Sequence, residues 1–315
     1  DFNTAFTALA TGQVHIFGAC SGTLQPGQVQ QAVRDFPNKI VVSTILHGMG
    51  QGGYFQTGVP PYNDVRVRKA MNLALDRQGW DMFKTVVGIR LFRYSGYMIP
   101  QMPMSPAAEE VLTYPGVRPD KEADIAEANR LLDEVFGVGK RFNGTFSMSN
   151  QANYIDISLY SADSLKKNTG IDMGIEVLEP AVNTKKTEAG NFQVSVSTAS
   201  FNTLVGDPDD SLLRWHKDFA APTMKLAMSG DGAARPEFTA QLEAEMMAMS
   251  NEVDPVRRKE LVKALDRKMW EEANYSFALG WNVIAYGSVP NLGGWYVYDT
   301  AVVSGHGLWE RLWIN

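Results

Sequence analysis

The sequence predicts an α/β fold, in which strands and helices alternate along the chain. Short apolar or alternating segments typical of strands occur at residues 145–148, 173–178 and 192–197. Segments with helical spacing of apolar residues separate them, at 153–168 and 181–189. The chain has 315 residues, of which 44% are hydrophobic, so it can bury a sizeable core. This alternation favours a sheet covered by helices.

The first fifty residues predict a small α/β piece. A short strand is expected at 13–17, a helix at 26–36 and a β-branched strand at 40–45. Four glycines follow between 48 and 53. They lack the strand–GxGxxG–helix context of a nucleotide site, so they predict a flexible hinge or loop.

The most informative stretch is Pro60–Arg77. After two prolines, Asn63 or Asp64 can cap a helix, because a short side-chain oxygen accepts the free N–H groups of the first turn. The apolar residues of this helix form one stripe, and they are Val67, Ala70, Met71, Ala74 and Leu75. The charged residues lie off that stripe, and they are Arg66, Arg68, Lys69, Asp76 and Arg77. Gly79-Trp80 then breaks the pattern, and a second short helix reaches Val87.

The remaining elements follow the same reasoning. A long irregular stretch rich in Met, Pro and Tyr covers 89–118, and Asp120 caps a helix that ends at Gly137. A loop-like stretch is expected at 218–235. After it, the pattern predicts helices at 236–250 and 254–273 and apolar strand material at 275–289.

The composition excludes several function classes. The net charge is -6, which argues against nucleic acid or an anionic membrane as the main partner. No apolar run approaches the ~20 residues that span a bilayer. The single cysteine, Cys20, cannot form a disulfide within the chain. Asp1–Thr4 lacks the basic and apolar regions of a signal peptide, which fits a mature exported protein, a cytoplasmic protein or a fragment.

No pattern of catalytic or metal-binding residues stands out. Cys20 has no catalytic flank, and a Gly-x-Ser-x-Gly motif is absent. The histidines do not have zinc-ligand spacing, and they are His15, His47, His216 and His306. Asp207, Asp209 and Asp210 could hold Ca²⁺ or serve a hydrolase, but helix capping explains them better. We therefore predict no cofactor, no metal and no enzymatic activity.

The order of residues in Pro60–Arg77 resembles a known family. Pro61-Tyr62-Asn63-Asp64, then Val67-Arg68-Lys69-Ala70, then Asp76-Arg77 match the segment that opens the large lobe of solute-binding proteins of peptide, nickel and sugar ABC importers. Residues 6–16 also resemble another pattern of that family, aromatic-x-x-Leu-x-x-Gly-x-x-Asp-Ile, with His15 where Asp is usual.

The resemblance implies a two-lobed periplasmic-binding-protein fold with an incomplete first lobe. Residues 1–53 would end the first lobe and form the hinge, 54–274 the large second lobe, and 275–315 the return to the first lobe. The implied function is capture of a small solute, such as an oligopeptide or a sugar, in a cleft between the lobes. Its partners would be the solute and the membrane subunits of an ABC permease, in the periplasm or outside the cell. Because this family carries a longer N-terminal portion, an N-terminal segment is expected to be missing.

The resemblance also places the solute near the loop before Asp207-Pro208. Peptide-binding members carry an Asp four residues before that Pro, whereas this chain has Leu204, which cannot bind an ammonium group. Sugars and other uncharged solutes are therefore expected to suit this site better than peptides with a free amino group. The predicted cleft residues are Tyr94, Phe201, Asn202 and Trp281.

Two alternatives remain open at this stage. The first is a hydrolase that uses the carboxylates of Asp207, Asp209 or Asp210. The second is a structural or chaperone-like protein that kept the fold without a ligand.

Overall fold

A computed structural model describes residues 2–17, 23–197, 206–294 and 313–314. Among these residues, the main strands form one mixed sheet. Its order is β1 (Ile16–Phe17), β9 (Ser276–Ser288), β2 (Val41–Phe55), β8 (Val194–Val196), β6 (Asn143–Ser149) and β7 (Asp172–Leu178). β6 is parallel to both β7 and β8, whereas the long β2–β9 pair is antiparallel. β5 (Phe92–Arg93) also pairs with β9. The short pairs are β3 (Thr85–Val86) with β4 (Ile89–Arg90), and β10 (Leu292–Gly293) with β11 (Trp313–Ile314).

Helices cover this sheet on both sides. In the first half of the chain they are α1 (Phe2–Ala10), α2 (Pro26–Asp35), α3 (Val65–Ala74), α4 (Arg77–Phe83), α5 (Ala108–Val111), α6 (Lys121–Phe136) and α7 (Ala152–Thr169). In the second half they are α8 (Pro180–Glu188), α9 (Pro208–Leu212), the 3₁₀ turn η2 (Leu213–Trp215), α10 (Pro222–Ala234), α11 (Pro236–Asn251), α12 (Pro255–Lys268) and the π-helical turn η3 (Met269–Ala273).

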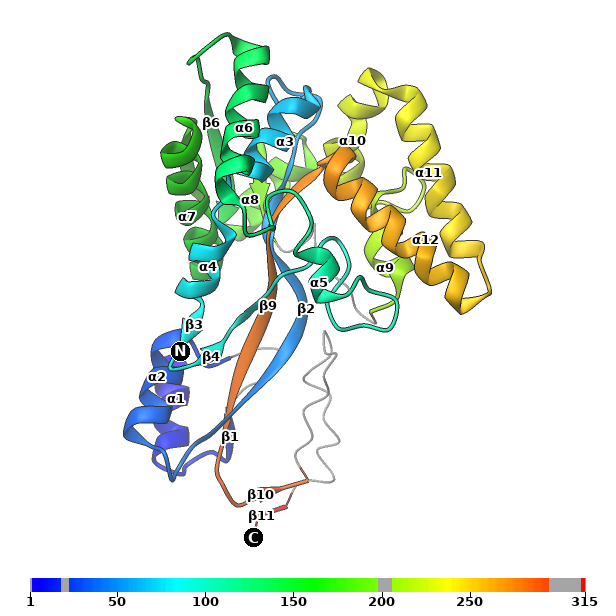
Figure 1. Ribbon diagram of the computed structural model, residues 1–315. Coiled ribbons are helices and arrows are strands. Elements are labelled where there is room, and N and C mark those ends of the chain that lie inside the picture. The colour runs from blue at the N-terminus through cyan, green and yellow to red at the C-terminus, as the bar shows by residue number, and fades with distance from the viewer. Residues whose placement is uncertain (1, 18–22, 198–205, 295–312, 315) are drawn as a thin grey trace.

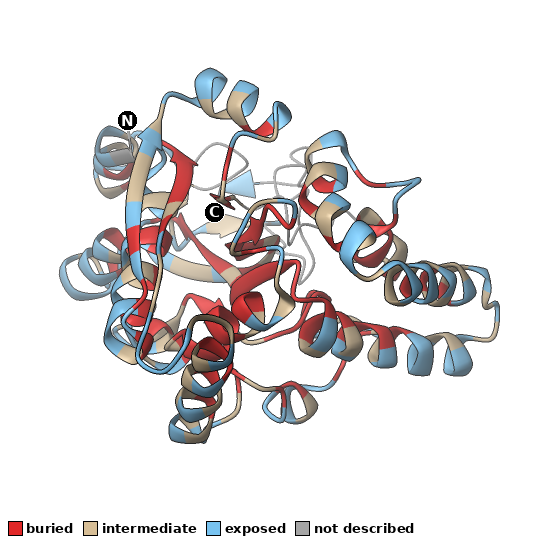
Figure 2. Cartoon of the chain, turned by 90° about the horizontal axis from the view of Figure 1, so that it is seen from above, coloured by how far each residue is buried: buried red, intermediate tan, exposed pale blue. Residues whose placement is uncertain are grey.

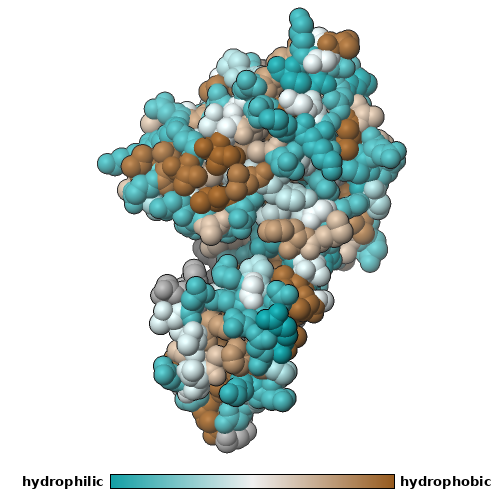
Figure 3. Space-filling model, turned by 90° about the vertical axis from the view of Figure 1, so that its left-hand side faces the viewer, coloured by the Kyte–Doolittle hydropathy of each residue, from teal (hydrophilic) through white to brown (hydrophobic). Residues whose placement is uncertain are grey.

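The molecule has a larger and a smaller part, joined by β2 and β9 (Figure 1). The smaller part, here called the small lobe, consists of α1, β1 and α2 with the adjoining halves of β2 and β9. The large lobe holds the other helices, with α6 and α7 on one side of the strands and α9, α11 and α12 on the other. Figure 3 shows the molecule narrowing where the two parts meet. The predicted α/β class with two lobes is confirmed.

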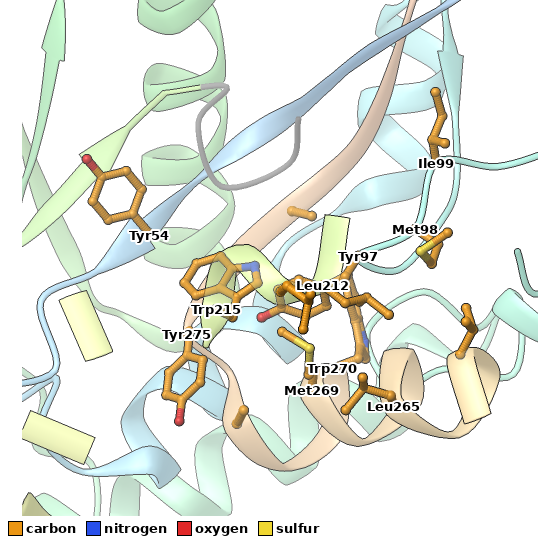
Figure 4. Packing of buried hydrophobic residues seen from close by; sticks show 14 of the residues in the cluster. Tyr54, Tyr97, Met98, Ile99, Leu212, Trp215, Leu265, Met269, Trp270 and Tyr275 are labelled. Carbon is orange, nitrogen blue, oxygen red and sulfur yellow. The ribbon is translucent and has the colours of Figure 1, made fainter. Parts of the chain in front are cut away.

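Each lobe has its own apolar core, and buried residues follow the central strands and the inward faces of the helices (Figure 2). In the large lobe, Trp215 stacks on Tyr275 with ring centroids 5.7 Å apart, and Tyr97 meets Trp215 edge to face at 5.7 Å (Figure 4). In the small lobe, Phe6 and Leu9 pack with residues of α2 and β9. The two lobes therefore have separate cores, and β2 and β9 run through both lobes.

The helix predicted at Pro60–Arg77 is present, but it is divided in two. Asp64 caps α3 as predicted, because its side chain accepts the N–H of Arg66 at 2.9 Å. α3 ends at Ala74, and α4 begins at Arg77 with Asp76 as its cap. The Asp76 side chain accepts the N–H of Gly79 at 2.9 Å. The prediction that Gly79-Trp80 breaks the pattern is therefore wrong, since both residues lie inside α4.

Two arginines of this stretch lie off the apolar stripe and are nevertheless fully buried. Arg68 donates hydrogen bonds to the carbonyl oxygens of Tyr62, Ala273 and Asn274, and to the carboxylate of Asp231 at 2.9 Å. Buried guanidinium groups need such partners because a charge without them is costly in the interior. Arg68 therefore fastens α3 to the residues that lead into β9.

Arg77 has a similar position one helix later. Its Nε donates to the carbonyl oxygen of Ala278 in β9 at 2.6 Å, and its Nη1 donates to the carbonyl oxygens of Asn72 and Gly116. Burial lowers the pKa of Arg77 to about 9, so the group remains cationic at neutral pH. Arg68 thus holds the residues just before β9, and Arg77 holds the beginning of the strand at Ala278.

Two predicted loops are regular structure instead. The glycines between 48 and 53 lie within β2, because β9 supplies hydrogen-bond partners along almost its whole length. The stretch 218–235 contains α10, despite Gly230 and Gly232 in its interior. A Cβ at Gly230 would lie 2.0 Å from the carbonyl oxygen of Thr57, so this glycine permits close packing of α10 on the chain after β2.

Candidate interlobe solute site

The two strands between the lobes are irregular at one level. Leu46 pairs with Val283 and Gly50 pairs with Trp281, so three residues of β2 oppose the single residue Asn282. A second shift follows between Gln51 and Gly52. Such bulges bend a strand and weaken the ladder locally. The β2–β9 ladder is therefore interrupted between Leu46 and Gly52, at the junction of the two lobes.

A short chain of polar side chains crosses the strands at this level. Trp80 of α4 donates its indole N–H to Gln51 Oε1 at 2.7 Å, and Gln51 Nε2 donates to Asn282 Oδ1 at 2.9 Å. His47 lies in the bulge, and its Nδ1 is buried without a hydrogen-bond partner among the described residues. Burial lowers the pKa of His47, so its imidazole is neutral at pH 7. These groups place hydrogen-bonding capacity at the junction of the lobes.

A pocket of 410 Å³ lies beside α9, the helix that Asp207 caps. Its walls include Asp209, Asp210, Leu213, Arg214, Phe219 and Thr223. Arg214 keeps 20% of its side chain exposed, and its Nε donates to the carbonyl oxygen of Asp210 at 2.9 Å. Its Nη2 lies 3.6 Å from Asp210 Oδ1.

The chemistry of this pocket follows from Arg214. Burial lowers the pKa of Arg214, but a guanidinium with an ordinary pKa near 12.5 remains charged at neutral pH. Its planar fork suits a carboxylate or another planar acceptor. Phe219, which is largely exposed, adds an apolar wall. Sequence reasoning missed Arg214, although an arginine four residues after Asp210 on the helix that follows Asp-Pro was a usable signal.

The structure places two of the four predicted cleft residues, and it places them side by side. Arg93 in β5 pairs with Trp281 in β9, and Tyr94 is the residue directly after Arg93. Trp281 is fully buried, and its Nε1 donates to the carbonyl oxygen of Gly96 at 3.2 Å. Phe201 and Asn202 lie outside the described residues, as does Leu204.

Tyr94 is half-buried and is held on several sides. Its ring meets Phe92 edge to face at 5.1 Å, and the Arg90 guanidinium lies over it at 5.1 Å. Burial raises the pKa of Tyr94 to about 12, so its hydroxyl stays protonated and can donate. Contact of Tyr94 or Trp281 with a solute remains a prediction.

The carboxylates considered for a hydrolase have structural partners. Asp207 caps α9 by accepting the N–H of Asp209 at 2.9 Å. Arg258 of α12 donates to Asp209 Oδ1 at 2.9 Å, and Ser250 donates to Asp209 Oδ2 at 2.9 Å. Within the described part of the chain, no group of three His, Cys, Asp or Glu residues could hold a metal ion. These contacts fit helix capping, and nothing in them supports hydrolysis.

Three solved structures with a similar fold contain bound ligands. *Haemophilus influenzae* OppA, in a complex with RPPGFSPFR, is 15% identical with a TM-score of 0.71, and the match covers 99% of this chain and 56% of OppA. DppA from *Helicobacter pylori*, in a complex with the peptide STSA, is 19% identical with a TM-score of 0.74, covering 100% of this chain and 55% of DppA. NikA from *Brucella suis*, in a complex with Fe(III)-EDTA, is 18% identical with a TM-score of 0.74, covering 100% and 60%. The chain therefore spans little more than half the length of these proteins.

Sequence comparison gives the family. No curated protein sequence matches the chain. No helix among the described residues is long and apolar enough to cross a membrane. Residues 1–222 match the sequence model described as bacterial extracellular solute-binding proteins, family 5 Middle. The match covers more than half of the chain and includes the Pro60–Arg77 segment, so the chain belongs to family 5 of the bacterial extracellular solute-binding proteins.

Proposed function

We propose that this chain is the solute-binding component of an ABC importer, which captures a small solute between its lobes and delivers it to a membrane permease. The observation that carries the proposal is the irregular β2–β9 pair between the lobes, with register breaks between Leu46 and Gly52. A solute that contacts both lobes stabilises the closed arrangement, because it binds that arrangement more tightly than the open one. The protein would act in the periplasm or outside the cell, and it would catalyse no reaction.

The lobe division is part of this proposal. Residues 1–53 and 275–315 would form the first lobe and its hinge, and 54–274 the second. These boundaries fall near the C-terminal end of β2 and just before β9. Since the chain spans 55% to 60% of the length of OppA, DppA and NikA, we propose that a further segment completes the first lobe.

The solute would meet the pocket beside α9 and the loop that precedes Asp207. Arg214 supports a solute with a carboxylate, such as an oligopeptide held by its C-terminal end. Leu204 replaces the acidic residue that would bind the ammonium end. Tyr94, Phe201, Asn202 and Trp281 are the further contacts that we propose, and their hydroxyl, amide and aromatic groups also suit a sugar.

The test is a calorimetric titration with four probes: tetra-alanine, its C-terminal amide, maltotriose and a nickel–histidine chelate. Tetra-alanine should bind, and its amide should bind about tenfold more weakly, because a hydrogen-bonded charge pair is worth about 1.5 kcal/mol. Arg214→Gln should remove this difference. Arg257→Gln is the matched control, because Arg257 is exposed and lies on α12, away from the pocket.

Each result has a defined meaning. Binding of maltotriose alone would keep the solute-binding role but reject the carboxylate assignment for Arg214. A chain that binds none of the four probes, and whose thermal unfolding none of them shifts, would contradict the proposed function.

A further inference from the structure

A second pocket is lined mainly by residues of α10 and α11. Both helices belong to the large lobe and lie away from the small lobe (Figure 1). Its volume is 520 Å³, which falls in the range of small-molecule sites. The turn η2 separates it from the pocket of Arg214: Leu213 and Arg214 line that pocket, whereas Trp215 lines this one. This pocket and the Arg214 pocket, where we propose that the solute binds, are therefore distinct cavities.

The inner wall of this pocket is apolar and aromatic. The rings of Trp215 and Tyr275 are stacked with an interplanar angle of 20°, and both residues are buried at the pocket. Leu242 and Met228 add aliphatic surface beside them. Figure 4 shows Trp215 and Tyr275 next to each other in the core of the large lobe. Both rings are almost completely buried, at 1% and 2% exposure, so they form a rigid floor. The apolar surface that a ligand can reach comes from Met228, Pro236 and Ala240 around that floor.

The rim carries one unbalanced positive charge. Lys217 is paired with Glu243 at 2.9 Å, so these two charges offset each other. Lys225 is exposed, and its ammonium group has no ion-pair or hydrogen-bond partner among the described residues. Glu243 would repel a second negative charge on a ligand. The charge pattern therefore favours a ligand with a single negative charge.

We propose that this pocket binds a small amphipathic monoanion, namely an aromatic or short aliphatic carboxylate. Its apolar part would rest against Met228, Pro236 and Ala240, above the floor formed by Trp215 and Tyr275, and its carboxylate would meet the ammonium group of Lys225. The site is independent of solute capture between the lobes, because it shares no lining residue with the Arg214 pocket.

Saturation-transfer NMR titrations of the full chain with phenylpropionate and with phenylpropionamide test this proposal. The carboxylate should bind about threefold to fivefold more tightly than the amide, because Lys225 is solvent-exposed and its ion pair is correspondingly weak. Lys225→Gln should remove that preference. Lys259→Gln should keep it, because Lys259 is equally exposed but lies on α12 outside the pocket.

A second variant tests the location. Ala240→Trp would place a large side chain from the exposed face of α11 into the pocket and should abolish binding of both probes. Far-UV circular dichroism checks that this variant is folded. The proposal is overturned if neither probe binds at millimolar concentration, if acid and amide bind equally well, or if folded Ala240→Trp binds as the unmodified chain does.

Discussion

Replacing Arg68 with leucine should destabilise the large lobe strongly. The guanidinium is 0% exposed and donates four hydrogen bonds, three of them to backbone carbonyl oxygens and one to Asp231. Leucine fills part of the space but leaves those carbonyl groups without their donors. Removing one partner of a buried ion pair typically costs 3–5 kcal/mol, because the other charge stays buried.

The environment of Asp231 places the expected loss within that range. Arg235 also donates to both carboxylate oxygens of Asp231, at 2.9 and 2.6 Å, so the carboxylate keeps one cationic partner in the variant. The net loss in the free energy of unfolding should therefore lie near the lower end, at about 3 kcal/mol. Urea unfolding, followed by tryptophan fluorescence and by circular dichroism, measures it.

Arg66 provides the control in the same helix. Its guanidinium is 46% exposed and pairs with Asp64 at 2.6 Å, so Arg66→Leu should cost less than about 1 kcal/mol. The reasoning would be refuted if the two variants lost the same small amount of stability. It would then follow that the hydrogen bonds of Arg68 are replaced by water or by rearrangement at little cost.

Three further substitutions test other contacts by denaturant unfolding. Burial raises the pKa of Asp266 from its usual range to about 6, so its contribution to stability is largely present at pH 4 and is lost as the pH rises through 6. Relative to Asp266→Asn, the free energy of unfolding of the native chain should therefore fall by about 2.5 kcal/mol between pH 4 and 7, and a constant difference would contradict this. Gly230→Ala should cost about 2 kcal/mol of stability, because its Cβ would meet the carbonyl group of Thr57. Gly232→Ala has open space around it and should stabilise the helix by up to about 1 kcal/mol. Equal effects of the two substitutions would be inconsistent with the packing. Gln51→Leu removes the acceptor of the Trp80 indole N–H and should lower the free energy of unfolding by about 1–3 kcal/mol. Unchanged stability would contradict this, because it would mean that the N–H finds another acceptor.

Local signals in the sequence predicted the elements well where a side chain acts on its own neighbours. Asp64 and Asp120 were expected to cap helices, and both accept backbone N–H groups of the first turn. The strands predicted at 145–148 and 173–178 are β6 and β7, with slightly longer bounds. For the two caps the partner lies two or three residues away, so the local sequence contains the whole interaction.

Long-range contacts account for the errors. The glycines between 48 and 53 suggest a loop when read alone, but β9, more than two hundred residues later, supplies the pairing that makes them a strand. Arg68 lies off the apolar stripe of its helix, and its acidic partner follows 163 residues later. Gly230 favours a loop by propensity, whereas contact with Thr57 makes a glycine necessary in the helix. No local pattern contains these partners.

The candidate site was predictable only in its position along the chain. The resemblance placed the solute near Asp207, and the pocket lined by Arg214 begins there. The individual residues were harder, because aromatic side chains serve cores and clefts equally well. Trp281 shows this directly, since its ring is completely buried and its N–H binds Gly96. The sequence places Arg214 four residues after Asp210, but the pocket beside it is formed only when the surrounding elements are in place.

The segment Pro60–Arg77 limits where the two lobes can bend. Arg68 holds the carbonyl groups of Ala273 and Asn274, and Arg77 holds that of Ala278, so the beginning of β9 is fixed to the large lobe. Its later residues pair with the part of β2 that belongs to the small lobe. In the proposed function, a closing motion would therefore take place beyond Ala278, where the ladder is interrupted opposite Asn282. The two helices of this segment, α3 and α4, would then be the fixed support against which β2 and β9 bend.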